Sequence, residues 1–240
     1  MIISTRGDVM INQYLEKKEN ISSDLSDDMP CYKSSMCIVK KKIFYAVIVK
    51  RCIDLVVSFL GLILLLPVFI IISLIIVLDD PGPVFFKQKR IGIYKKTFYI
   101  HKFRSMKTST PKNVPTHMLL NPEAYITRVG RFLRKYSLDE LPQLWDIFVS
   151  NLSIIGPRPA LWNQYDLIAL RDKYGVNEIK PGLTGWAQIN GRDELPIEIK
   201  ACLDGEYVQK MSFLFDCRCF FATIWCVLKH DGVIEGKIKQ

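Results

Sequence analysis

Residues 53–78 read IDLVVSFLGLILLLPVFIIISLIIVL, an apolar run with few polar breaks. About 20 such residues are enough for a helix to cross a bilayer. Lysines and arginines flank the run on both sides, whereas a simple crossing concentrates them on the cytoplasmic side. Pro67 lies near the middle, where proline removes a helix hydrogen bond and favours a kink. We therefore expect a re-entrant membrane helix bent at Pro67; a spanning helix and a buried core helix are the alternatives.

The charge balance of the chain limits the classes of partner. The 240 residues carry a net charge of +9, which fits a protein that rests on anionic membrane lipids and handles phosphorylated substrates. The sequence contains no nucleic-acid recognition motif or basic helix stripe, so we expect no nucleic-acid partner. The seven cysteines lack the paired spacing of a zinc site or a disulfide framework and are typical of thiols in a reducing compartment.

The sequence predicts an α+β fold that is mostly helical, in three parts. Residues 1–42 form a polar variable extension, residues 43–80 a membrane-embedded re-entrant helix, and residues 81–240 a catalytic domain on the cytoplasmic face. Residues 84–88 and 97–103 are rich in aromatic and β-branched residues and predict a small antiparallel β-hairpin.

Helices are expected over residues 160–173, 196–210 and 213–229. The last of these has a broad apolar side rich in aromatic residues. That pattern is typical of an amphipathic helix lying in the membrane interface, and a helix packed on the core is the alternative.

A second stretch, Ser137-Leu138-Asp139-Glu140-Leu141-Pro142-Gln143-Leu144, places two adjacent carboxylates where a helix is expected to begin. Ser137 and Glu140 have the spacing of a capping box, which would place both acids in a first helical turn. The helix dipole favours negative charge there. An ionised carboxylate in this position can act as a nucleophile or bind a divalent cation, and a surface helix cap is the alternative.

Basic residues in rigid surroundings lie on either side of this stretch. They are Lys102, Arg104, Arg158 and Arg192. Arg158 stands between two prolines in Gly156-Pro157-Arg158-Pro159, and rigid neighbours reduce the entropy lost when an arginine binds phosphate. Each cluster alone is typical of a turn or a surface salt bridge. Together with a membrane element they indicate phosphate chemistry at a bilayer surface.

Seven ordered motifs lie between residues 49 and 233, namely residues 50–54, 80–88, 102–106, 127–131, 137–144, 156–159 and 181–192. With these motifs the chain closely resembles the small monotopic phosphoglycosyl transferases, a bacterial sugar transferase family that acts on polyprenol phosphate. The chain departs from the family pattern at Asp146, where members often carry asparagine.

The resemblance implies a two-step reaction on a UDP-sugar donor and an undecaprenyl phosphate acceptor. Asp139 would be the nucleophile that takes up the sugar phosphate and releases UMP, and Glu140 its partner. Mg²⁺ would be held at these two carboxylates. Lys102, Arg104, Arg158 and Arg192 would contact phosphate or nucleotide, Asp204 is a further candidate site residue, and Pro67 corresponds to the helix-breaking proline.

The resemblance also implies where the protein works and leaves the sugar open. It implies the cytoplasmic face of the bacterial inner membrane and the initiation of a surface glycan such as capsule, exopolysaccharide, O-antigen or glycoprotein. Homo-oligomers are possible. An N-acetylated amino sugar is expected, with a hexose as the alternative. A non-catalytic membrane scaffold of a glycan assembly complex is the alternative from a different class.

Overall fold

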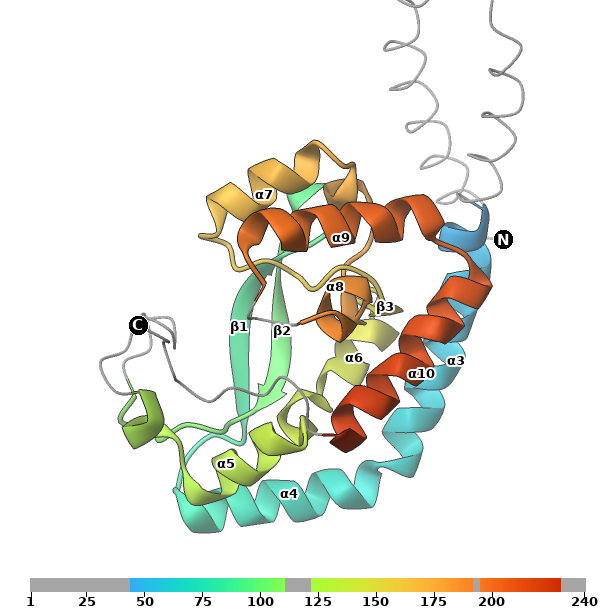
Figure 1. Cartoon of the computed structure of the whole chain (residues 1–240). Coiled ribbons are helices and arrows are strands. Elements are labelled where there is room, and N and C mark those ends of the chain that lie inside the picture. Colours follow the sequence, from blue (N-terminus) through green and yellow to red (C-terminus); the bar gives the residue numbers. More distant parts are fainter. Residues whose placement is uncertain (1–43, 111–121, 192–194, 230–240) are drawn as a thin grey trace, which may run out of the picture. The chain divides into compact units, whose positions relative to one another are not determined.

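The computed structural model describes residues 44–110, 122–191 and 195–229 (Figure 1). The predicted polar extension 1–42 lies outside the described residues. The chain divides into two compact units between Ile53 and Asp54, and the elements below belong to the second unit unless their bounds show otherwise. The predicted boundaries at residues 42 and 80 stay predictions.

The apolar run forms two helices that meet at a bend. A π-helical turn, Tyr45–Val49, continues into α3, Lys50–Leu64, and α4 follows over Leu66–Asp79. Pro67 lies in the first turn of α4, where its missing N–H leaves no hydrogen bond unmade. The two helices meet at an angle of 59°. Within the described ranges no single helix is long and apolar enough to span a membrane, whereas the bent pair taken together has the required length and composition. The break beside Pro67 is confirmed, and re-entry into a membrane stays a prediction.

Helix α4 packs against the rest of its unit along one side only. Ile72 and Ile76 are buried with Phe103 and with Leu133 of helix α5, Arg128–Lys135. Figure 1 shows α4 running beneath α5 at the edge of the unit. Apolar side chains on the remaining surface of α4 are exposed, namely Leu66, Ile70, Ile71, Leu74, Ile75, Val77 and Leu78. An ordinary core helix would cover these side chains.

The predicted hairpin is confirmed. Strand β1, Phe85–Ile91, pairs antiparallel with β2, Thr97–Phe103, and the register runs from Phe85 opposite Phe103 to Ile91 opposite Thr97. The connection contains a 3-10 turn, Ile93–Lys95, in which Tyr94 has a φ of 54°. The aromatic end of the hairpin packs on α4, because the ring centroid of Phe103 lies 5.3 Å from that of Phe69, a residue of α4.

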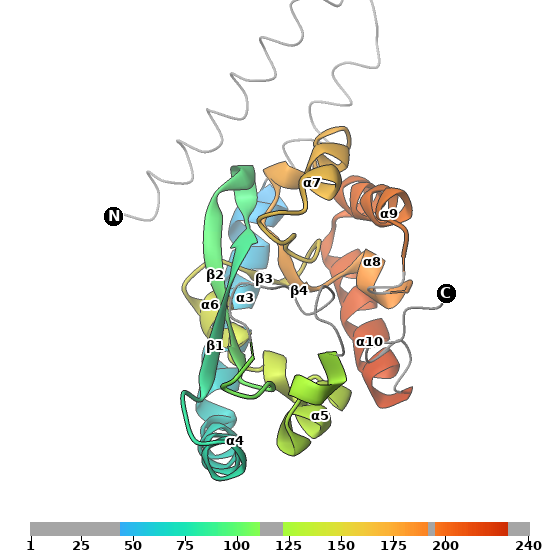
Figure 2. The same cartoon turned by 90° about the vertical axis from the view of Figure 1, so that its left-hand side faces the viewer.

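A second, parallel pair of strands was not predicted. Strand β3, Ser153–Ile155, pairs with β4, Gly182–Thr184, and each strand is only three residues long. The close approach of the two strands requires glycine at position 182, since a Cβ there would lie 2.1 Å from the Gly156 nitrogen. Figure 2 shows this pair between the hairpin on one side and the C-terminal helices on the other.

The C-terminal helices follow the predicted pattern with one shorter element. Helices α9, Ile197–Lys210, and α10, Phe213–Lys229, match their predicted spans closely. Helix α7 covers only Tyr165–Asp172, because residues 160–164 contain a bridge from Leu161 to Arg90 and a turn instead of the predicted start of the helix. The short helices α6, Gln143–Phe148, and α8, Trp186–Ile189, and the 3-10 turns Pro122–Tyr125 and Val176–Glu178 complete the described elements.

An acidic residue attaches α3 to the small parallel sheet. The Asp54 side chain is 3% exposed, and its Oδ1 accepts a hydrogen bond from the Ile154 backbone N–H at 2.9 Å. Further along the helix, Gly61 lies against the Leu144 side chain of α6. These contacts connect the apolar helix directly to the strand that leads into residues 156–159.

Candidate active site

Asp139 and Glu140 lie on a 3-10 turn, Leu138–Glu140, which we call the carboxylate turn. The predicted capping box is wrong. Ser137 has a φ of 56°, in the left-handed region, whereas an N-cap residue is normally extended, and its side chain makes no capping hydrogen bond. Helix α6 begins only at Gln143, after Pro142. The two acids therefore precede the helix and do not occupy its first turn.

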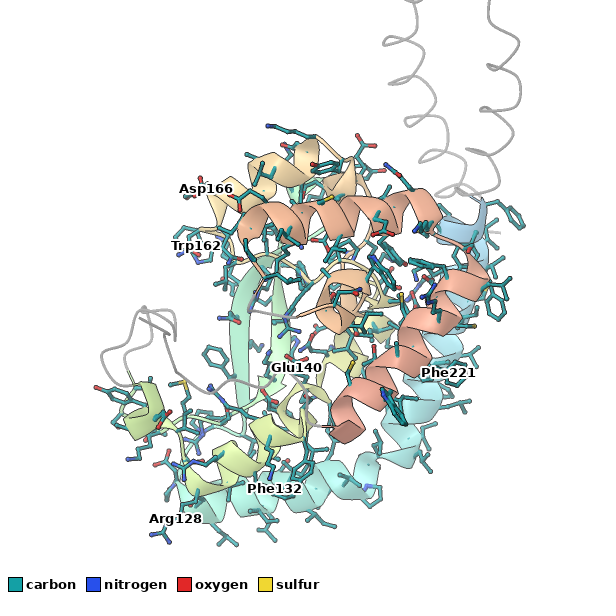
Figure 3. The ribbon with its side chains drawn as sticks, viewed as in Figure 1. Arg128, Phe132, Glu140, Trp162, Asp166 and Phe221 are labelled. Carbon is teal, nitrogen blue, oxygen red and sulfur yellow. The ribbon has the colours of Figure 1, made fainter. Side chains whose placement is uncertain are left out.

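Glu140 joins three segments that are distant in the sequence. Lys102 Nζ, from the end of β2, donates to Glu140 Oε1 at 2.6 Å, and Arg158 Nη2 donates to the same oxygen at 2.7 Å. Arg158 Nη1 lies 3.4 Å from Oε2. Figure 3 labels Glu140 where the carboxylate turn meets the hairpin. We call these three residues the Glu140 cluster; it brings together two of the predicted phosphate-binding cations and one predicted catalytic acid.

The two cations keep Glu140 ionised. Burial by itself would raise the pKa of Glu140, but the charges and hydrogen bonds of Arg158 and Lys102 outweigh it and hold that pKa well below its usual range. A carboxylate that accepts charge-assisted hydrogen bonds from two cations is stabilised in its charged form.

Asp139 behaves differently from Glu140, because its pKa is raised. Burial raises the pKa of Asp139, and the neighbouring Glu140 charge adds to this; Lys102, Arg134 and Arg158 act in the opposite direction. The residue is 9% exposed. A desolvated carboxylate is a stronger nucleophile in its ionised form, because less hydration must be removed before it reacts.

Arg134 is a site cation that sequence reasoning missed. It lies in the last turn of α5, and its Nε donates to Ser105 Oγ at 2.8 Å. Its charge lowers the pKa of Asp139 and so opposes burial, which is the largest effect and raises that pKa. The available signal was its position five residues before Asp139, on the helix that leads into the carboxylate turn.

Arg104 lies apart from the Glu140 cluster, at the exit from α4. Its Nη1 donates to Asp80 Oδ2 at 2.9 Å and its Nη2 to the Asp80 backbone oxygen. The same carboxylate accepts the Thr108 backbone N–H at 2.8 Å. In this structure Arg104 therefore ties the end of α4 to the segment after β2.

Asp204 is also outside the Glu140 cluster. It is 1% exposed on α9 and pairs with Arg171 of α7, whose Nε and Nη2 reach Asp204 Oδ2 at 2.9 Å and 2.5 Å. Burial raises the pKa of Asp204 even though Arg171 opposes the shift. The predicted site residue Arg192 lies outside the described residues.

Asp146, the departure from the family pattern, is accommodated by the hairpin. It is fully buried, its Oδ2 accepts the His101 backbone N–H at 2.8 Å, and its Oδ1 lies 2.8 Å from His101 Nδ1. His101 immediately precedes Lys102 on β2. The contact therefore fixes α6 against the strand that supplies Lys102.

Within the described ranges, no group of three or more His, Cys, Asp or Glu side chains is placed to hold a metal ion. The two adjacent carboxylates lie beside three cations, Lys102, Arg134 and Arg158, and cations of this kind can bind phosphate oxygens.

A model of the bacterial sugar transferase family matches residues 45–230. The chain belongs to the bacterial sugar transferase family. It is 40% identical over 187 residues to the uncharacterized sugar transferase EpsL of Bacillus subtilis (strain 168), covering 78% of this chain and 90% of that protein. The expectation of a phosphoglycosyl transferase of this family is confirmed.

Two further relatives of this sugar transferase carry names that state a donor or a carrier. The chain is 40% identical over 185 residues to the UDP-glucose:undecaprenyl-phosphate glucose-1-phosphate transferase of Escherichia coli (strain K12), covering 74% of this chain and 40% of that protein. It is 34% identical over 197 residues to the UDP-galactose-lipid carrier transferase of Erwinia amylovora, covering 76% of this chain and 41% of that protein. The chain thus spans less than half the length of these two relatives.

Proposed function

We propose that this protein transfers a sugar 1-phosphate from a UDP-sugar to undecaprenyl phosphate and so initiates synthesis of a surface glycan. The observation that carries the proposal is the contact of Glu140, the neighbour of Asp139, with Lys102 and Arg158 at hydrogen-bonding distance, in a chain of the sugar transferase family. The names of the relatives support the same class of donor and acceptor.

In the proposed first step, an Asp139 carboxylate oxygen attacks the sugar-bearing phosphorus of the donor. A bond forms between that oxygen and the phosphorus, the bond from the phosphorus to the bridging oxygen breaks, and UMP leaves with the electron pair. In the second step, a phosphate oxygen of undecaprenyl phosphate attacks the same phosphorus and releases the Asp139 carboxylate. The product is a sugar joined to undecaprenol through a diphosphate.

The surrounding cations fit the charge that this reaction handles. Lys102 and Arg158 meet at one Glu140 oxygen, and Arg134 is near enough to influence Asp139. Preorganised cations stabilise the charge that develops on a phosphoryl group during transfer. Glu140 keeps Lys102 and Arg158 in place before the donor binds, and we propose that their remaining hydrogen-bond donors meet the diphosphate.

Mg²⁺ is part of the proposal. Asp139 is the first proposed ligand, because it is an acid on the carboxylate turn directly next to Glu140. Glu140 Oε1 accepts N–H groups at 2.6 Å and 2.7 Å, and Oε2 accepts one at the longer distance of 3.4 Å, so Oε2 is the less engaged oxygen and the proposed second ligand. Proteins bind Mg²⁺ through one or two carboxylates together with phosphate and water. Bound there, the ion would neutralise the diphosphate of the donor.

The donor sugar is the least constrained part of the proposal. The resemblance alone indicated an N-acetylated amino sugar, whereas the names of the relatives include UDP-glucose and UDP-galactose. Those names favour a hexose donor. A panel of UDP-glucose, UDP-galactose and their N-acetylated counterparts, with mass spectrometry of the lipid product, identifies the sugar.

We also propose that α4 and α10 hold the protein on the cytoplasmic face of the inner membrane. Both helices leave large apolar side chains uncovered, and Figure 3 shows Phe221 extending from α10. The exposed side chains on α10 include Phe213, Leu214, Phe220, Phe221 and Trp225. With α3 and α4 re-entrant, tags placed before residue 43 and after residue 240 both face the cytoplasm; an N-terminal tag accessible from outside the cell would show a spanning helix instead.

The reaction is tested with the membrane-bound protein, undecaprenyl phosphate and the panel of UDP-sugars. Wild type should release UMP in a reaction that stops with EDTA and resumes with Mg²⁺, and Asp139→Asn should release none. The matched control is Asp166→Asn, an exposed position on α7 away from Glu140 in Figure 3. UMP release by Asp139→Asn at the wild-type rate would overturn the nucleophile assignment. No UMP release by wild type, together with intact glycan production in cells that carry Asp139→Asn, would favour the scaffold alternative.

A further inference from the structure

The backbone of residues 157–159 is held by three other elements. The Pro157 oxygen accepts the Gly182 backbone N–H of β4 at 2.9 Å. The Arg158 oxygen accepts Arg171 Nη2 at 3.0 Å, and the Pro159 oxygen accepts Arg90 Nη1 of β1 at 3.0 Å. Three consecutive carbonyl groups thus have donors from β4, α7 and β1.

Both ends of this segment are fixed as well. The Gly156 backbone N–H donates to the Thr184 oxygen at 2.7 Å, and the Ala160 oxygen accepts the Ile91 N–H at 2.9 Å. The two prolines at 157 and 159 have no N–H groups, so their carbonyls are the polar backbone groups that can be held. We call residues 156–160 the clamped loop. It presents Arg158 to Glu140 from a backbone with little freedom to move.

The donor to the Arg158 carbonyl is the buried Arg171. Arg171 is 4% exposed and Asp204 is 1% exposed, and two N–H groups of Arg171 reach one Asp204 oxygen. Arginine suits this place because its planar group can bind a carboxylate and still direct an N–H to a third group. A pair of this kind loses solvation on burial, so it is a poor device for stability alone.

We propose that Arg171, oriented by Asp204, is a positioning residue for Arg158. It holds the Arg158 backbone at the place from which the Arg158 guanidinium reaches Glu140 and the donor phosphates. This inference rests on the proposed function, and it reassigns Asp204 from contact with substrate to support of the clamped loop. The competing reading is that the pair only joins α7 to α9.

A double-mutant cycle on the full-length membrane-bound protein separates these readings. Arg171→Gln is preferred to a substitution of Asp204. When Arg171 is removed, the remaining Asp204 carboxylate can become neutral by taking up a proton, whereas Arg171 without Asp204 would stay charged. We expect Arg171→Gln to lower kcat about 10-fold and Arg158→Gln about 100-fold, since a displacement of about 1 Å can reduce a rate 100-fold. If Arg171 acts through Arg158, the double variant should match Arg158→Gln within about 3-fold. Multiplied losses, about 1,000-fold in total, would overturn the positioning role.

A second measurement does not depend on activity. Amide hydrogen exchange in peptides covering residues 156–161 should be faster in Arg171→Gln than in wild type, and Arg171→Lys should restore part of the protection. Lys95→Gln is the matched control, because Lys95 pairs with Asp172, the residue next to Arg171, at the exposed end of α7. Unchanged exchange in Arg171→Gln would also overturn the proposal. Failure of the proposed function is distinct, since wild type would then release no UMP.

Discussion

The Glu140 cluster and the Asp204–Arg171 pair both place a carboxylate against arginine, yet the pKa values of the two acids move in opposite directions. Burial raises the pKa of both carboxyls. At Glu140 the combined effect of Arg158 and Lys102 exceeds it, and the net pKa is lowered. At Asp204 the charge and hydrogen bonds of Arg171, together with the charge of Lys200, do not offset burial, and the net pKa is raised. The carboxyl that is hydrogen-bonded to two cations is thus the one whose pKa is lowered.

Asp139 adds a third case to this comparison. It has three cations nearby, but none is hydrogen-bonded to it among the causes of its pKa shift, and burial raises its pKa. Burial is the largest cause of the raised pKa at both aspartates, Asp139 and Asp204. The site contains one acid held firmly in its charged form beside another that is desolvated and less restrained.

The largest effect is expected from breaking the Glu140 cluster. Glu140→Gln keeps the shape of the side chain and removes the charge that holds Lys102 and Arg158. We expect kcat to fall about 100- to 1,000-fold, as when one preorganised group is lost from an active site. Steady-state UMP release measures this. The control is Glu198→Gln, an exposed glutamate on α9, and a rate for Glu140→Gln equal to that control would remove Glu140 from the machinery.

The buried pair should show a smaller effect, on stability. Asp204→Asn leaves Arg171 charged and buried, and removing one partner of a buried ion pair destabilises a protein by about 3 kcal/mol or more. Urea unfolding in detergent should show this loss, whereas Glu140→Gln should lose less because Lys102 and Arg158 are more exposed than Arg171. Equal losses in the two variants would show that the regions do not differ as described.

The pH dependence of stability tests the direction of the shift at Glu140. A carboxyl whose folded-state pKa is depressed contributes stability above its unfolded value, here 4.5, and loses it as the pH falls toward the folded pKa. In EDTA, the unfolding free energy of wild type should therefore decrease below that pH more steeply than that of Glu140→Gln. One group contributes at most about 1.4 kcal/mol per pH unit. Parallel curves would contradict the assignment.

The smallest effect is expected at an exposed pair. Lys95 and Asp172 lie 2.7 Å apart with side chains 53% and 43% exposed, and such pairs contribute about 0–1 kcal/mol. Lys95→Gln should change the unfolding free energy by less than about 1 kcal/mol, and less in high salt. A loss as large as that of Asp204→Asn would mean that burial does not separate the two kinds of pair.

Elements with a long periodic pattern were predictable from the sequence, and short ones were not. The hairpin and helices α9 and α10 follow their patterns. Strands β3 and β4 are too short to show alternation. The capping box failed because Leu138 and Leu141 pack against the core that contains Phe103 and Ile76, and this packing outweighs a local cap.

The candidate site was predictable in its acids and in two of its cations. Lys102 and Arg158 meet Glu140, but contacts across 38 and 18 residues cannot be read from the sequence. Arg104 was grouped with Lys102 because the two residues are close in the sequence, and alternate residues of a strand point to the same face. Strand β2 ends at Phe103, however, and Arg104 turns to Asp80 instead. The partner of Asp204 is 33 residues away, so its support of the clamped loop needed the fold.

The hydrogen bond from Ile154 to Asp54 has a consequence for how the site meets its lipid substrate. Ile154 is four residues before Arg158, and Asp54 lies on the apolar helix α3. A protein embedded through α3 and α4 would therefore carry Arg158 at a constant height above the hydrocarbon. The phosphate of a polyprenol cannot leave the headgroup layer without exposing its chain to water. The depth of one helix would thus set the level at which enzyme and acceptor meet.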